Sequence, residues 1–238
     1  MGCCDLKEIE LPNSVESVNE LAFYGCKGLT TLTISNNLDS IGNSAFAGCS
    51  SLTTLTFPNG LSSVGNSAFY ECSGLTSLYI SKSVKSIGSD AFRSCSELSL
   101  VKSEIVLPFR IGVYTFDCAN NCVLIVPRGL KEHYIRNGWG QFKGGVFETG
   151  AVVKADNIIV FKGYEIPELT YTVDGEPTEG LPKLICEVNA NSPCGTYPII
   201  VEKGSLECLY GGELTFIGGI LTKEVFVWPQ GHMKTMLY

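Results

Sequence analysis

Nucleophilic or metal-binding chemistry in this sequence would have to come from two histidines and 11 cysteines. A Cys–His nucleophile needs the imidazole within hydrogen-bond reach of the thiol. We expect His133 on the solvent-exposed face of a short helix beside Tyr134, and His232 lies in the C-terminal tail. Cys118 and Cys122, spaced as CxxxC, would give with His133 three of the four ligands that structural zinc takes. The sequence therefore predicts no catalytic residue, no metal site and no cofactor.

Four of the cysteines recur at intervals of 23 residues, at Cys26, Cys49, Cys72 and Cys95. If a repeated coil places them in one interior column, their Cα atoms lie about 5 Å apart, a distance that a disulfide can span. Equivalent side chains of stacked coils point in parallel, however, which disfavours the dihedral angle of about 90° that a disulfide requires. We expect buried, reduced thiols in an apolar column, where a hydroxyl would lack a hydrogen-bond partner. Disulfide formation stays open for five of the other cysteines: Cys118, Cys122, Cys186, Cys194 and Cys208.

The interval of 23 residues belongs to a repeat that extends beyond the cysteines, and it falls within the ~20–29 residues of leucine-rich repeats. Alternation at Leu32-Thr33-Ile34 predicts a strand with Leu and Ile inward and Thr outward. Stacked coils would then form a parallel sheet, phenylalanines would fill the interior from the return limb, and repeated glycines would serve turns. The positions in phase include Phe23, Phe46, Phe69 and Phe92, then Leu29, Leu52, Leu75 and Leu98, and the glycines Gly42, Gly65 and Gly88.

The repeated unit resembles the BspA-like leucine-rich repeats, also called the Treponema pallidum type. Residues 41–58 read IGNSAFAGCSSLTTLTFP, and the motif extends over about residues 3–127. The resemblance implies a leucine-rich-repeat solenoid in a secreted or surface-anchored protein of host-associated microbes. It also implies adhesion to host proteins.

We expect the repeat array to end in a capping element. Residues 126–142 read VPRGLKEHYIRNGWGQF and resemble the usual ending of such arrays. Terminal repeats differ from inner ones because they cover an exposed apolar end. The segment predicts a short helix, with Trp139 and Phe142 covering the last coil. The repeat domain with its cap is therefore expected at residues 1–145, with a hinge near Gly144-Gly145.

Residues 146–238 are predicted to form a small all-β domain, because short apolar segments alternate there with turn residues. The expected strands lie at 158–161, 169–173, 183–186, 197–201 and 214–217, with Cys186 and Cys208 on or near strands and Cys194 in a turn. The segments PELTYTVDG (167–175) and SPCGTYPI (192–199) resemble the bacterial MBG surface domain, which implies a stalk or spacer role. The predicted fold class is mainly β, a leucine-rich-repeat solenoid with a parallel sheet followed by this small all-β domain.

The outward-facing strand positions are the candidate ligand-binding residues. They form a flat, hydroxyl-bearing stripe with one aromatic residue and charged ends, and solenoid sheets commonly bind proteins on such faces. A second interpretation is that Thr is simply a good strand residue facing water. Glycan binding is a third interpretation, although it would favour several exposed aromatics on one face. The candidates are Thr31, Thr33, Thr54, Thr56, Ser77 and Tyr79.

Composition and charge exclude several classes of function. The net charge of −7 provides no basic surface for nucleic acid, and no apolar run reaches the ~20 residues of a membrane helix. Residues 1–145 contain 12 acidic and 11 basic side chains, whereas residues 146–238 contain 12 and 6. We therefore predict a non-enzymatic bacterial cell-surface or secreted protein. Its repeats would bind a host or microbial extracellular protein, or alternatively a glycan, with the β domain as spacer and the signal and anchor outside this chain.

Overall fold

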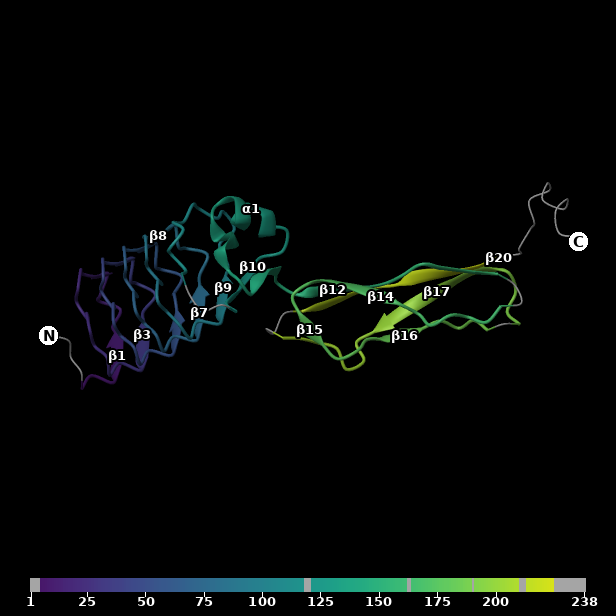
Figure 1. The fold of residues 1–238 in the computed structure, drawn as a ribbon, viewed down its shortest axis with the longest axis horizontal. Helices are drawn as coiled ribbons and strands as arrows, with labels where there is room; N and C mark the ends of the chain where they lie inside the picture. The colour runs from purple at the N-terminus through teal and green to yellow at the C-terminus, as the bar shows by residue number, and fades with distance from the viewer. Residues whose placement is uncertain (1–4, 118–120, 162–163, 190, 210–212, 225–238) are drawn as a thin grey trace, which may run out of the picture. The chain divides into compact units, whose positions relative to one another are not determined.

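The chain divides into two compact units, Met1–Thr149 and Gly150–Tyr238, each shown in Figure 1. The structure is a computed structural model that describes residues 5–117, 121–161, 164–189, 191–209 and 213–224. Both units are built mainly from β-strands, which confirms the predicted fold class. Within the described residues, no helix is long and apolar enough to span a bilayer.

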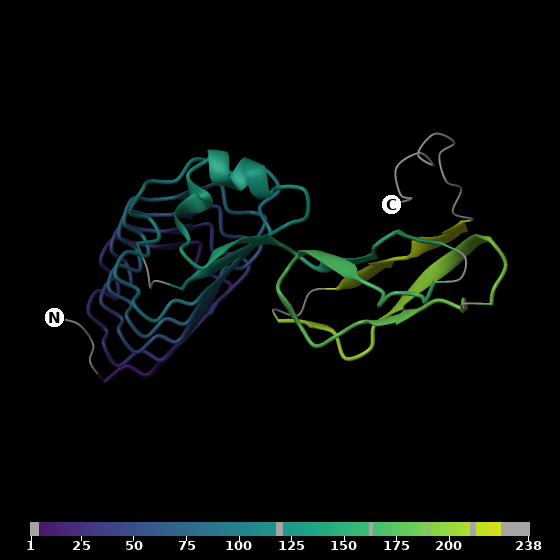
Figure 2. The same ribbon diagram turned by 45° about the vertical axis from the view of Figure 1, so that its right-hand side comes forward.

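The first unit is a solenoid of stacked coils, in which each full coil gives one strand to a long parallel sheet and a two-residue strand to a second one (Figures 1 and 2). Register partners are 23 residues apart in the regular coils, as in the pair Thr56 and Tyr79. On this side, β1 (Glu8–Leu11) and β3 (Thr31–Ile34) form a two-stranded sheet. The long sheet that follows contains β5 (Thr54–Thr56), β7 (Ser77–Ile80), β9 (Leu100–Ser103), β10 (Val123–Val126) and β11 (Gly145–Glu148). The second sheet contains β2 (Ser17–Val18), β4 (Ser40–Ile41), β6 (Ser63–Val64) and β8 (Ser86–Ile87).

The long sheet differs from the predicted continuous sheet at one place. Strand pairing runs from β5 through β7, β9 and β10 to β11, and β1 pairs separately with β3. The ladder is therefore interrupted between β3 and β5, although the coils on either side remain stacked through a shared core.

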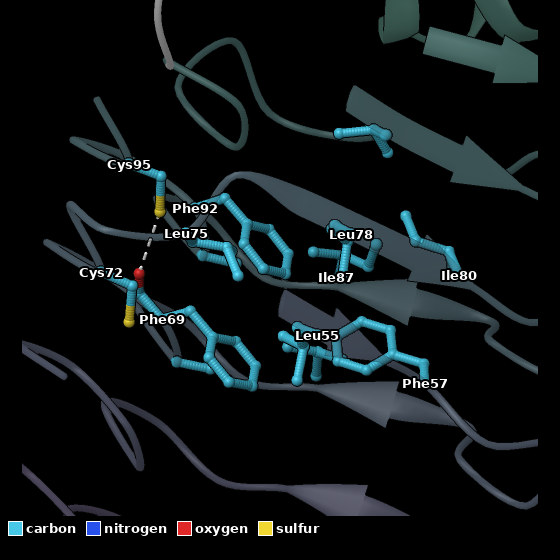
Figure 3. Packing of buried hydrophobic residues seen from close by; sticks show 14 of the residues in the cluster. Leu55, Phe57, Phe69, Cys72, Leu75, Leu78, Ile80, Ile87, Phe92 and Cys95 are labelled. Atoms are coloured by element: carbon cyan, nitrogen blue, oxygen red, sulfur yellow. Dashed lines mark hydrogen bonds between the residues drawn. The ribbon is translucent and has the colours of Figure 1, made fainter. Parts of the chain in front are cut away.

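Apolar side chains at equivalent positions of successive coils fill the interior of the solenoid (Figure 3). Leu55 and Leu78 are buried on the inner face of neighbouring strands, and Phe69 and Phe92 enter from the return limb. The rings of Phe69 and Phe92 stack with centroids 5.3 Å apart and planes within 3°. Offset or stacked ring pairs add to the free energy of burial, so this ladder ties each coil to its neighbours.

The column of cysteines is buried as predicted, but its surroundings are not purely apolar. The thiols of Cys49, Cys72 and Cys95 each donate a hydrogen bond to a phenylalanine carbonyl oxygen of the preceding coil. The sulfur–oxygen distances are 3.4 Å from Cys49 to Phe23, 3.3 Å from Cys72 to Phe46 and 3.4 Å from Cys95 to Phe69 (the last is drawn in Figure 3). The expectation that a hydroxyl here would lack a partner is therefore wrong, because a carbonyl acceptor already lies at the site.

The repeated glycines were predicted to serve turns, but the structure shows that they are required by close contact between coils. A Cβ atom placed on Gly65 would lie 2.6 Å from the backbone nitrogen of Asn43 in the preceding coil, and one on Gly88 would lie 2.5 Å from that of Asn66. Real Cβ atoms do not approach backbone so closely. These glycines therefore allow adjacent coils to stack at close range.

The last coil is closed by helix α1 (Lys131–Arg136) and the 3-10 helix η1 (Trp139–Gln141). Trp139 is fully buried, its ring lies 5.6 Å from that of Phe116, and its Nε1 donates to the carbonyl oxygen of Phe109 at 2.8 Å. The ring of Phe142 lies 5.0 Å from that of Phe116. The prediction that Trp139 and Phe142 cover the last coil is confirmed.

The Gly144-Gly145 pair does not end the first unit. Gly145 begins β11, which pairs in parallel with β10 and buries Val146. The backbone N–H of Thr149 also donates to the carbonyl oxygen of Val126 at 2.7 Å. The first unit therefore ends at Thr149, and the predicted hinge lies inside a hydrogen-bonded strand.

The second unit contains a three-stranded sheet in the order β14-β12-β19, a four-stranded sheet in the order β13-β20-β17-β16, and a short β15-β18 pair. Its small core includes Ala155, Val160, Ile199 and Leu221. The structure confirms a strand in each predicted segment and places Cys208 in β18, as expected, and it adds three strands that the sequence did not indicate: β12, β15 and β20. The bounds are β12 (Ala151–Ala155), β13 (Ile158–Phe161), β14 (Tyr171–Gly175), β15 (Thr178–Glu179), β16 (Lys183–Ile185), β17 (Gly195–Glu202), β18 (Glu207–Cys208), β19 (Leu214–Ile217) and β20 (Gly219–Glu224).

Candidate binding site

The six candidate residues occupy the outer face of β3, β5 and β7, as the alternation predicted. Their inward neighbours Leu32, Leu55 and Leu78 are buried. The four threonines Thr31, Thr33, Thr54 and Thr56 are exposed, whereas Ser77 and Tyr79 are partly buried. Thr54 pairs in register with Ser77, and Thr56 with Tyr79.

A groove of about 470 Å³ lies along one margin of this outer face. Three candidates, Thr33, Thr56 and Tyr79, line it, and the other three do not. The groove also reaches the turns that follow the strands, since Asn36, Asn59 and Ser81 line it as well. The remaining lining residues are Leu32, Ile34, Asn36, Phe57, Pro58, Asn59, Ser81 and Glu104.

Tyr79 and Glu104 both line the groove. The carboxylate of Glu104 is exposed and lies close enough to the phenol of Tyr79 to affect its pKa. Partial burial of the phenol raises the pKa of Tyr79 to about 12, and the nearby carboxylate of Glu104 acts in the same direction. At neutral pH the phenol of Tyr79 is therefore neutral, and the negative charge of this part of the groove belongs to Glu104.

Sequence reasoning missed Asn36, Asn59 and Glu104, which bring amide and carboxylate groups to the groove. Asn36 and Asn59 are 23 residues apart and occupy one position of the repeat. Glu104 stands 23 residues after Ser81, which also lines the groove. The sequence could have indicated them if the 23-residue repeat had been compared beyond the end of each strand, at the positions of the following turn.

The residues considered for nucleophilic or metal chemistry are not gathered into a site. His133 lies exposed on α1, as predicted, while Cys122 is buried. Among the residues with described positions, no three His, Cys, Asp or Glu side chains form a group that could hold a metal ion. Cys118 and His232 lie outside the described residues. In the second unit, Cys194 is exposed near a turn, and Cys186 and Cys208 are partly buried.

The buried thiols of the solenoid are also poor nucleophiles. Burial raises the pKa of Cys49 to about 12, and it raises the pKa of Cys72 well above its usual value, with neighbouring cysteines adding to both shifts. Thiolate is the reactive form of cysteine. These side chains therefore stay protonated at neutral pH and act as core residues.

Comparisons with known proteins concern mainly the solenoid. The BspA type leucine-rich repeat region matches residues 1–123 in six copies. A leucine-rich repeat protein from Bacteroides ovatus ATCC 8483 is 28% identical, with a TM-score of 0.46 over 53% of this chain and 31% of its own length. This chain thus spans about a third of that relative. A comparison with curated proteins gave no match.

Two further solved structures are similar to parts of the chain. The T. pallidum leucine-rich repeat protein is 27% identical, with a TM-score of 0.47 over 61% of this chain and 76% of its own length. A leucine-rich cell surface protein from Faecalibacterium prausnitzii A2-165 is 25% identical, with a TM-score of 0.26 over 44% of this chain and 42% of its own.

Proposed function

Because the chain belongs to the BspA-type leucine-rich repeat family, we propose that it is a non-enzymatic adhesion module, whose repeat domain binds an extracellular protein of a host or another microbe. The outer face of β3, β5 and β7 is the surface that contacts this partner. The observation that carries the proposal is the groove, which is lined by Thr33, Thr56 and Tyr79 on the sheet side and by polar turn residues on the other. Solenoids use extended sheet faces of this kind for binding.

The protein acts at the cell surface or outside the cell in this proposal. Family resemblance supports that location, because BspA-like repeats imply a secreted or surface-anchored protein. The second unit resembles an MBG surface domain in two sequence segments, and it serves as a spacer that holds the repeats away from the cell. Its excess of acidic side chains favours solubility in that role.

Glycan binding is the second candidate function, and the polar composition of the groove supports it. Hydroxyl groups of Thr33 and Thr56 stand near amides of Asn36 and Asn59, and Tyr79 provides one aromatic ring. Such convergent polar groups beside a ring are suited to a sugar. We rank it second because Tyr79 is the sole aromatic side chain among the candidate residues.

Binding to panels of purified extracellular proteins and glycans tests both candidates. Changing Thr33, Thr56 and Tyr79 together to Ala should abolish binding of the partner without lowering the melting temperature of the second unit. The matched control changes Tyr24, Ser63 and Ser86 to Ala, since these residues lie on the return limb away from the groove. Retention of binding by the groove variant would contradict the proposed surface, and selective retention of glycans alone would favour the second candidate.

A further inference from the structure

The groove has negative charge that the described part of the chain does not neutralise. No cation lies within ion-pair distance of Glu104 among the described residues. Glu10 is the register partner of Thr33, so a second carboxylate stands one coil away from the opposite end of the groove. Lys102 is the register partner of Tyr79, but it does not line the groove.

Apolar surface and an aromatic ring accompany this charge. Leu32, Ile34 and Pro58 line the groove, and Tyr79 adds its ring next to the carboxylate of Glu104. A long cationic side chain buries its aliphatic stem on apolar surface while its head pairs with charge. Arginine suits this combination better than lysine, because its planar guanidinium both stacks on an aromatic ring and pairs with a carboxylate through two parallel hydrogen bonds.

We propose that the groove binds an arginine side chain of the protein partner, with the guanidinium placed between the Tyr79 ring and the Glu104 carboxylate. This rests on the proposed function, which makes the outer face of the sheet the contact surface, and it specifies what that surface recognises. The ring of Tyr79 contacts the guanidinium, and the carboxylate of Glu104, which lines the same groove, pairs with its charge.

The test uses the full chain and three short peptides, acetyl-Gly-Xaa-Gly-amide, in which Xaa is arginine, lysine or citrulline. Citrulline has nearly the shape of arginine without its charge. The arginine peptide should perturb the NMR signals of Tyr79, and the citrulline peptide should bind roughly tenfold more weakly, because a charge-assisted pair is lost. Lysine should bind with intermediate affinity. Raising the salt concentration should weaken the binding of the arginine peptide, because an exposed ion pair is screened.

Glu104→Gln tests the carboxylate in the same assay, with Glu97→Gln as the control for an equal change in net charge outside the groove. The first change should weaken arginine binding roughly tenfold and the second should leave it unaltered. Tyr79→Leu, which removes the ring, should also weaken arginine binding, whereas Tyr79→Phe, which keeps the ring and removes only the hydroxyl group, should cause a smaller loss. This pair of variants tests the proposal independently if Glu104→Gln lowers the melting temperature.

Equal binding of the arginine and citrulline peptides, an unaffected Glu104→Gln variant, or no response of Tyr79 to the arginine peptide would each overturn the inference. None of these results would contradict the proposed function. The proposed function would be contradicted by a different result, namely that the variant with Thr33, Thr56 and Tyr79 changed still binds the protein partner.

Discussion

The solenoid and the second unit reach a stable interior by different means. In the solenoid, one set of apolar side chains recurs in every coil, and the buried cluster continues from Leu11 to Val146. The second unit has a small apolar core and leaves Ile159, Ile200 and Ile220 half exposed or more. It also buries two charged side chains, Glu176 and Lys223. A repeat can thus extend its core with every coil, whereas the second unit has only a small apolar interior.

Polar groups inside the two units differ in the same way. The ammonium group of Lys223 donates to the carbonyl oxygens of Asn189 at 3.0 Å and Ser192 at 2.7 Å, which fixes one particular loop. The thiol of Cys72 bonds a backbone carbonyl that every regular coil offers at the same place. In the second unit this buried contact therefore holds one loop in place. In the solenoid the buried thiol contact joins each coil to the preceding one.

The largest expected difference between the units comes from removing the cap. Trp139→Ala takes a fully buried indole from the end of the phenylalanine ladder, and it should destabilise the solenoid by about 3–5 kcal/mol. The second unit should melt as before. Differential scanning calorimetry of the full chain would measure both transitions.

Leu221→Ala is the reciprocal control, because Leu221 is fully buried in the core of the second unit. It should lower the melting temperature of that unit and leave the solenoid unaltered. If either substitution shifted both transitions by similar amounts, the two units would be one cooperative structure, and the contrast drawn between them would be wrong.

Much of the solenoid is predictable because the same positions of successive coils must be apolar, so the pattern recurs several times in the sequence. Leu55 and Phe69 each have equivalents in neighbouring coils, so their inward direction follows from the period alone. The groove was not predictable in that way, since it depends on Tyr79 and Glu104, which replace smaller residues at two repeat positions. The end of the unit was not predictable either: a Gly-Gly pair indicates a break in sequence, yet Gly145 adopts a φ of +105° and begins another strand.

A smaller effect is expected from the cysteine column. Cys72→Ala leaves a small void and should cost the solenoid about 1 kcal/mol. Cys72→Ser should fall within about 1 kcal/mol of the Ala variant, because its hydroxyl can donate to the carbonyl oxygen of Phe46 that the thiol uses. Reductant should leave the wild-type melt unchanged. Thermal melts of the three proteins with and without reductant provide the measurement.

Alkylation distinguishes the column from exposed cysteine within the same molecule. Iodoacetamide at mild alkaline pH should label Cys194 quickly, because it is exposed, and Cys72 only after unfolding, because burial raises its pKa. A wild type that is destabilised by reductant would indicate disulfides and would contradict the thiol column.

The smallest effect should come from separating the units at their boundary. Residues 1–149 and 150–238 each contain their own buried cluster, so each should melt cooperatively at the temperature of the corresponding transition in the full chain. A cut at the predicted boundary provides the comparison: residues 1–145 lack most of β11, expose the partners of Val146 and remove the Glu148 carboxylate that accepts the Lys131 N–H at 3.1 Å. That shorter fragment should melt at a lower temperature than residues 1–149. Equal stability of the two fragments would show that β11 adds nothing to the solenoid, and an unfolded 150–238 fragment would show that the second unit depends on the first.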